Sequence, residues 1–227
     1  MKESDDLNIA KDSIEQCIKL FSDCIQLKTD ESVIKSHIKN IIKFRLEFLD
    51  LAEKSVDHCT KLLCYIVNLK AVISFIDDKT IHEENIIEEL KSLSNETKDY
   101  EANLQALSEQ IMKIINEFLN INDDFKSHID KIKLKEAKKR FGITQPYQII
   151  PDIAVSLTKF KLYWDEQRTT LSRILRNINN TGKGNRVNRL NIKVIGHLLE
   201  NLKSSIFYYN YAISGTLTYE KMINTSF

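Results

Sequence analysis

The chain has 227 residues, of which 42% are apolar and 29% charged, and a formal net charge of +1. This composition suits an amphipathic helical protein with much exposed surface. Glycine and proline are scarce, with 5 and 2 residues, and neither occurs in residues 1–141. Because β-sandwiches and α/β folds need turns at short intervals, and turns favour these residues, the composition argues against both and favours long helices.

The N-terminus and the cysteines indicate a cytoplasmic protein. The first six residues are polar and acidic, unlike a signal peptide, and the chain has no run of 18 apolar residues. The four cysteines fall within helical patterns and lack the spacing of zinc ligands. We therefore expect small buried residues in a reducing compartment. They are Cys17, Cys24, Cys59 and Cys64.

Two helices are predicted in the first third of the chain. The first covers residues 4–27, where apolar residues recur in steps of three and four. The second covers residues 31–76, and its apolar stripe is wide enough to pack against more than one neighbour. The stripe of the first helix consists of Leu7, Ala10, Ile14, Cys17, Phe21 and Cys24.

The third predicted helix, residues 81–140, has the longest heptad stripe in the chain. Its acidic start and basic end complement the helix dipole. At 1.5 Å per residue it would span about 90 Å, and the second helix about 70 Å, so residues 31–140 are predicted to form a long antiparallel hairpin. The stripe consists of Ile86, Leu90, Leu93, Thr97, Tyr100, Leu104, Leu107, Ile111, Ile114, Phe118, Ile121 and Phe125.

The last third adds two helices that pack along this hairpin. Prolines at 146 and 151 disfavour helix at the preceding residue, so residues 142–151 are predicted to be a connector. Apolar periodicity predicts helices over 151–179 and 189–224, separated by a glycine-containing loop. The sequence thus predicts one all-α domain over 1–227, an elongated antiparallel bundle of about five helices built on a coiled-coil-like hairpin.

No pattern indicates a catalytic residue, a cofactor site or a metal site. The five histidines are too far apart to share a helical turn, and no His-Glu-x-x-His or Glu-x-x-His motif occurs. The glycine- and lysine-rich loop at 181–186 lacks the spacing of a phosphate-binding loop. We therefore expect a protein that is not an enzyme.

Charge is distributed unevenly along the chain. Residues 1–125 carry a net charge of −10 and residues 126–203 a net charge of +11. The basic region either faces the acidic helices of the same bundle, which is the favoured interpretation, or binds an external anion such as lipid or nucleic acid. Few aromatic residues interleave with the basic ones, which argues against nucleic acid. The candidate anion contacts are Lys138, Lys139, Arg140, Lys183, Arg186 and Arg189.

Two stretches with little charge are candidates for membrane or partner contact. One lies in residues 62–76 and the other, residues 204–219, has no charged residue. Either could lie in a membrane interface, although packing within the bundle is the favoured alternative. The candidate contacts are Leu62, Leu63, Tyr65, Ile66, Phe207, Tyr208, Tyr209 and Tyr211.

The layout resembles the elongated bundles of α-helical pore-forming toxins of the cytolysin A and haemolysin BL type. The features that carry the resemblance are a short first helix, a long helix with an apolar end at 62–76, a longer antiparallel helix, and a later helix that contains the segment 160–164 (Phe-Lys-Leu-Tyr-Trp). The resemblance implies an elongated all-α fold and activity at membranes. BAR-like and spectrin-like bundles share much of the same pattern.

Three functions follow from these patterns. The leading hypothesis is a non-enzymatic interaction or scaffold protein that binds another protein or itself, because the heptad stripe is long and site chemistry is missing. The second is a membrane-active bundle, and the third is anion binding through residues 126–203.

Overall fold

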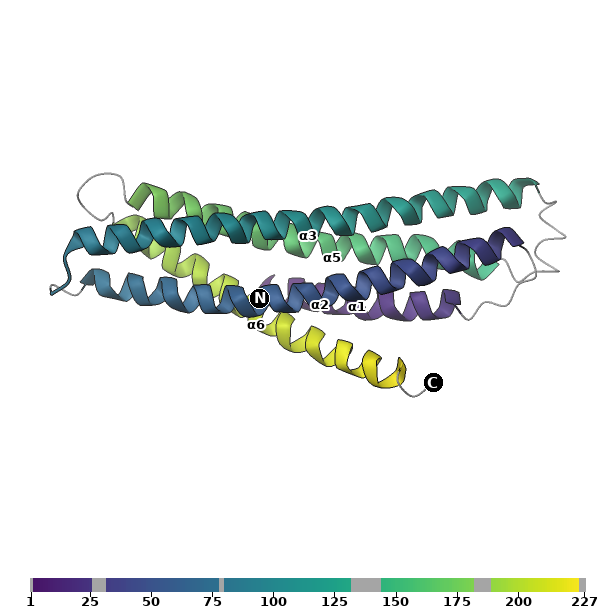
Figure 1. Cartoon of the computed structure of the whole chain (residues 1–227), viewed down its shortest axis with the longest axis horizontal. Helices are drawn as coiled ribbons and strands as arrows, with labels where there is room; N and C mark the ends of the chain where they lie inside the picture. The colour runs from purple at the N-terminus through teal and green to yellow at the C-terminus, as the bar shows by residue number, and fades with distance from the viewer. Residues whose placement is uncertain (1, 26–31, 78–79, 132–143, 182–188, 225–227) are drawn as a thin grey trace.

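The computed structural model describes residues 2–25, 32–77, 80–131, 144–181 and 189–224. These ranges contain five α-helices and one 3-10 turn, with no β-strand, so the prediction of an all-α fold is confirmed. The long helices lie side by side in an elongated antiparallel bundle (Figure 1). The elements are α1 (Lys2–Ile25), α2 (Ser32–Ser74), η1 (Phe75–Asp77), α3 (Glu83–Lys131), α5 (Thr144–Thr181) and α6 (Arg189–Asn224).

Helix α3 is one unbroken helix of 49 residues, as its heptad stripe predicted. Every stripe position from Ile86 to Ile121 is buried except Tyr100, which is half-buried. Phe125 falls among the side chains that the structure does not describe. Glu83 and Glu84 occupy the first turn, where their charges favour the helix dipole.

Helices α2 and α3 form the predicted antiparallel hairpin, but α3 packs most extensively on α5. Tyr65 of α2 hydrogen-bonds Thr97 of α3, and the Tyr100 hydroxyl donates to the carbonyl oxygen of Lys61 at 3.2 Å. Helix α5 lies along α3 and also packs on α1 (Figure 1). The most extensive helix pair of the bundle is therefore α3 and α5.

The predicted connector at 142–151 is wrong from Thr144 onward, because α5 begins there and includes Pro151. Pro146 lies in the first turn, where its missing N–H needs no partner. Pro151 lies further inside, where proline costs about 3 kcal/mol. Its neighbours Ile150 and Ile153 are fully buried. Since a buried isoleucine contributes roughly 1.5–3 kcal/mol, their packing offsets the proline.

Helix α6 has the predicted bounds, but its first turns bury a different face. Leu190 and Val194 are exposed, whereas Ile192 and Ile195 are buried. The prediction followed residues four apart, and at 3.6 residues per turn such a row drifts around the helix. Helix α6 crosses the bundle obliquely, and its C-terminal end points away from the other helices (Figure 1).

All five helices contribute to one hydrophobic core. Its centre is a chain of phenylalanine rings from α1, α2, α3 and α5, with centroids 5.3–5.8 Å apart. These rings belong to Phe21, Phe48, Phe118 and Phe160. Three of the cysteines are buried as predicted, but Cys64 is exposed, and all four are free thiols.

Candidate functional site

Tyr209 anchors the C-terminal half of α6 to the core and is fully buried. The Ser55 hydroxyl donates to the Ala52 carbonyl oxygen at 2.6 Å, so its one proton is used. The Tyr209 hydroxyl must then be the donor in its 2.6 Å bond to Ser55. The ring also stacks on Tyr163, with centroids 5.0 Å apart. Burial raises the pKa of Tyr209 well above its ordinary value, so the phenol stays neutral and able to donate.

Tyr65 links α2 to α3 in the same manner. Thr97 donates to the Leu93 carbonyl oxygen at 2.6 Å, and the Tyr65 hydroxyl donates to Thr97. Burial raises the pKa of Tyr65, as it does for Tyr209. Both tyrosines were predicted to contact a membrane or a partner, and the structure corrects this placement. A buried tyrosine is stable there because its hydroxyl has a hydrogen-bond partner.

The predicted contact residues therefore divide between core and surface. In this fold Leu62, Tyr65, Ile66 and Tyr209 are buried and offer no surface to a partner. Leu63 is half-buried. Phe207, Tyr208 and Tyr211 are exposed. The helical repeat explains the division, because residues 207, 208 and 211 lie on one side of α6 and residue 209 on the other.

The exposed rings Phe207, Tyr208 and Tyr211 form a patch that we term the aromatic face. Their exposed fractions are 55%, 56% and 80%, and the centroids of the first two rings are 5.8 Å apart. With about 150–250 Å² per aromatic side chain, the three expose roughly 300–480 Å². An apolar patch of that size on one protein often marks an interaction site. The surrounding segment, residues 204–219, carries no charge.

A groove of about 1180 Å³ runs between α1 and α6 beside the aromatic face. Phe207 and Tyr211 belong to both the aromatic face and the groove. The Thr216 hydroxyl donates to the Glu15 carboxylate at 3.2 Å and joins the two walls. The groove is thus uncharged on its α6 side and bears one acid and one base on α1. Other residues that line it include Ile18, Lys19, Leu63, Asn210 and Ala212.

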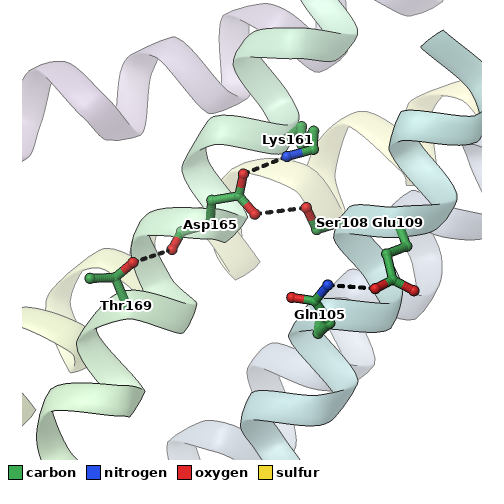
Figure 2. Close-up of polar contacts among 6 residues, drawn as sticks. All are labelled: Gln105, Ser108, Glu109, Lys161, Asp165 and Thr169. Atoms are coloured by element: carbon green, nitrogen blue, oxygen red, sulfur yellow. Dashed lines mark hydrogen bonds and ion pairs between the residues drawn. The ribbon is translucent and has the colours of Figure 1, made fainter. Parts of the chain in front are cut away.

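A ladder of polar contacts fixes α5 against α3. Its three rungs are spaced seven residues apart on both helices, so one contact recurs in each heptad. In the rung that Figure 2 shows, Ser108 donates to the Asp165 carboxylate at 2.7 Å, and Lys161 pairs with the same carboxylate at 2.6 Å. The rungs are Ser94–Asn179, Glu101–Ser172 and Ser108–Asp165.

Electrostatics at the Asp165 rung favour the charged carboxylate. Partial burial by itself would raise the pKa of Asp165, but the hydrogen bonds from Lys161 and Ser108 outweigh burial and lower it. Thr169 donates to the Asp165 backbone carbonyl and leaves the carboxylate to Ser108 of α3 and Lys161 of α5 (Figure 2). The rung is an ionised, hydrogen-bonded contact rather than a proton donor.

The predicted anion contacts remain a prediction. Lys138, Lys139, Arg140, Lys183 and Arg186 lie outside the described residues. Arg189 begins α6, but its side chain is also outside the described set.

The interpretation that the basic region 126–203 pairs with the acidic helices of the same bundle has limited support. The ion pair between Lys70 and Glu200 joins α2 to α6. Among the described side chains, no ion pair joins acidic α3 to basic α5. The described contacts between these two helices include the polar ladder.

The described ranges contain neither a metal-binding cluster nor a membrane-spanning helix. No group of three or more His, Cys, Asp or Glu side chains there could hold a metal ion. In the same ranges, no helix combines the length and the apolar character needed to cross a membrane.

Comparisons with known proteins give one similarity. No protein-family model matches the chain, and no curated protein matches it. Among solved structures the chain is similar to the soluble AhlC triple head mutant of AHL, the tripartite α-pore forming toxin from Aeromonas hydrophila. The match covers 88% of this chain and 98% of that chain, with 10% identity and a TM-score of 0.38. The matched chain is a component of an α-pore forming toxin, the class of protein that the layout of this chain resembles.

Proposed function

We propose that this chain is a non-enzymatic helical interaction protein that binds its partner through the aromatic face of α6 and the adjoining groove. The observation that carries the proposal is the exposure of Phe207, Tyr208 and Tyr211 together on a segment without charge. Aromatic residues are enriched at the buried centres of protein interfaces and among the residues whose truncation costs most affinity.

The inner side of α6 supports this role because it holds the aromatic face rigidly. Tyr209 is bonded to Ser55, and the side-chain amide of Asn210 donates to Thr60 at 3.2 Å. Both contacts join α6 to α2 at positions next to the exposed rings in the sequence. A surface that is already ordered loses little conformational entropy on binding, which favours affinity.

A second candidate is peripheral membrane binding by the same face. Tyr208 and Tyr211 have the amphipathic side chains that favour the membrane–water interface. Val67 of α2 and Phe75 of η1 are also exposed, with fractions of 59% and 46%. The protein-interaction role is preferred because the aromatic face adjoins a groove, and a concave wall suits a protein surface better than a flat lipid surface.

Site-specific photo-cross-linking tests the proposal. A benzophenone amino acid replaces Tyr211 in the full chain, expressed in its native cells, and cross-linked proteins are identified by mass spectrometry. The control places the same probe at Leu162 of α5, which is 58% exposed and outside the aromatic face. We expect a discrete protein adduct from position 211 and none from position 162. Equal labelling at both positions, or adducts with lipid alone at position 211, would contradict the proposal.

A further inference from the structure

We propose that residues 144–150, the first turns of α5, form a latch that opens from the bundle about a hinge at Pro151 while the rest of the helix stays packed. The proposal does not depend on the aromatic face, which lies on α6. Three observations support it: the place where the polar ladder stops, the buried residue opposite Pro151 on α3, and the proline itself.

The polar ladder holds only the C-terminal part of α5 against α3. Its rungs reach Asp165, Ser172 and Asn179 of α5. One heptad nearer the latch, the same register sets Thr158 of α5 opposite Ile115 of α3. Thr158 donates within its own helix, to the Ala154 carbonyl oxygen at 2.8 Å, and Ile115 is apolar. The ladder therefore has no rung at this level.

One further heptad along, Asn122 of α3 lies opposite the hinge. It follows Ser108 by two heptads, and Pro151 precedes Asp165 by two heptads, so the register of the ladder pairs the two positions. Asn122 is 7% exposed, and its side-chain oxygen has no hydrogen-bond partner among the described residues. A buried amide oxygen without a donor costs free energy, and Pro151 has no donor to offer it. This contact weakens the closed state at the level of the hinge.

Pro151 also weakens the backbone connection between the latch and the rest of α5. Proline has no N–H to donate to the carbonyl oxygen four residues earlier in the helix, and its ring crowds that carbonyl group. Sharp bends in helices are found mostly at such positions. The latch is therefore less firmly joined to the rest of α5 than it would be with alanine at position 151.

Two fully buried isoleucines lie on opposite sides of the hinge. Ile153 follows Pro151, and the Cys17 thiol of α1 donates to its carbonyl oxygen at 3.9 Å. Ile150 precedes Pro151 and is the last residue of the latch. Opening at Pro151 therefore exposes Ile150 and leaves Ile153 in the core.

Thiol labelling at these two positions tests the latch. In a C64S background, which removes the exposed native thiol, I150C and I153C each place one cysteine on one side of Pro151. We expect maleimide to label position 150 at least about tenfold faster than position 153. Local opening exposes little surface, so the rate at position 150 should be nearly independent of urea below the unfolding transition. The rate at position 153 should rise with the slope of global unfolding.

Three variants in the I150C chain test the role of the hinge. P151A should slow labelling at position 150 at least about tenfold, because it restores a helical hydrogen bond across the hinge. P146A is the matched control and should leave the rate unchanged, since a first-turn proline is compatible with helix. N122L removes the buried oxygen that lacks a donor and should slow labelling about three- to tenfold. Far-ultraviolet circular dichroism verifies that each variant keeps its fold.

Hydrogen–deuterium exchange of the unsubstituted chain gives a readout that no introduced cysteine can disturb. The backbone amides of residues 148–150 are expected to exchange at least about tenfold faster than those of residues 155–160. Four results would each overturn the latch: equal exchange in these two segments, equal labelling at positions 150 and 153, a rate at position 150 that follows the global urea slope, and a P151A variant that labels as fast as its parent. None of them bears on the proposed function, because the aromatic face lies on another helix.

Discussion

Ser108 of α3 donates a 2.7 Å hydrogen bond to Asp165 of α5, and the next rungs of the ladder follow at heptad intervals on both helices. Apolar stripes alone permit two helices to slide by one heptad, because the stripe repeats. A slide in one direction would bring Glu101 against Asp165, two like charges. A slide in the other direction would bury Asp165 against Ile115. The polar rungs therefore select a single register.

The Ser108–Asp165 rung should be measurable as a coupling energy. S108A is expected to lower the free energy of unfolding by about 1–2 kcal/mol, because it removes a hydrogen bond to a charged group. A double-mutant cycle of S108A and D165A, followed by urea denaturation, should give a coupling of about 0.5–1.5 kcal/mol. Strictly additive effects would mean that the rung contributes nothing to stability.

The same rung gives a defined pH dependence. Folding lowers the pKa of Asp165 below its ordinary value near 3.8, so the folded chain binds this proton less readily than the unfolded chain. The stabilisation is present above the unfolded pKa and is lost as pH falls through the folded pKa. The difference in unfolding free energy between wild type and D165N should therefore shrink between about pH 5 and about pH 2. A difference that stays constant or grows with acid would contradict this assignment.

Because Tyr209 donates its hydrogen bond to Ser55, substitutions of these two residues should lower the free energy of unfolding by different amounts. S55A leaves the buried Tyr209 hydroxyl without an acceptor and should cost about 1–3 kcal/mol. Y209F leaves Ser55 still bonded to the Ala52 carbonyl and should cost less, about 0.5–1.5 kcal/mol. Thermal unfolding of the two single variants and the double variant measures this order. A larger loss for Y209F than for S55A would reverse the donor assignment.

Pro151 in the interior of α5 should destabilise the fold, so its replacement is expected to increase stability. P151A keeps the buried Ile150 and Ile153 and restores a backbone hydrogen bond, so it should raise the free energy of unfolding by about 1–3 kcal/mol. P146A is the matched control, because a first-turn proline is already compatible with helix, and it should be neutral or slightly destabilising. Urea denaturation compares the two. A destabilised P151A would show that the proline itself is required for packing.

Helix positions were predictable from the sequence because two independent signals agreed. Glycine and proline, which favour turns, do not occur before residue 142, and this predicted long helices. Apolar residues that recur in steps of three and four from Ile86 to Ile121 predicted the buried face of α3. Those signals are local. Where local signals conflicted, at Pro151, the prediction failed because the burial of Ile150 and Ile153 is a property of the tertiary fold.

The partner of each helix was much harder to predict. A heptad stripe shows that a face is buried but not against which helix, so α2 rather than α5 was expected to be the main neighbour of α3. The heptad spacing of Ser94, Glu101 and Ser108 was a visible signal for a second contact line. The matching residues on α5, which are Asp165, Ser172 and Asn179, have the same spacing, but spacing alone does not show that the two lines of residues face each other.

The surface site was predictable only in part. Lack of charge in residues 204–219 indicated a candidate contact segment, but it does not distinguish a buried side from an exposed one. Phe207 and Tyr211 face solvent, and Tyr209 between them faces the core. Cys64 shows the reverse case, because a residue type that is usually buried is exposed here.

The central claim, that the aromatic face is covered by a partner when the protein works, can be measured by chemical labelling in cells. Tyr211 is replaced by cysteine in a C64S background, which removes the exposed native thiol, while Cys17, Cys24 and Cys59 are buried. Burial raises the pKa of Cys24 to about 12 and raises those of Cys17 and Cys59 as well, so these thiols should not react. The rate of maleimide labelling is then compared between dilute purified protein and intact cells, with L162C as the control. We predict that cells slow labelling at position 211 at least about tenfold relative to position 162, and equal slowing at both positions would contradict the account.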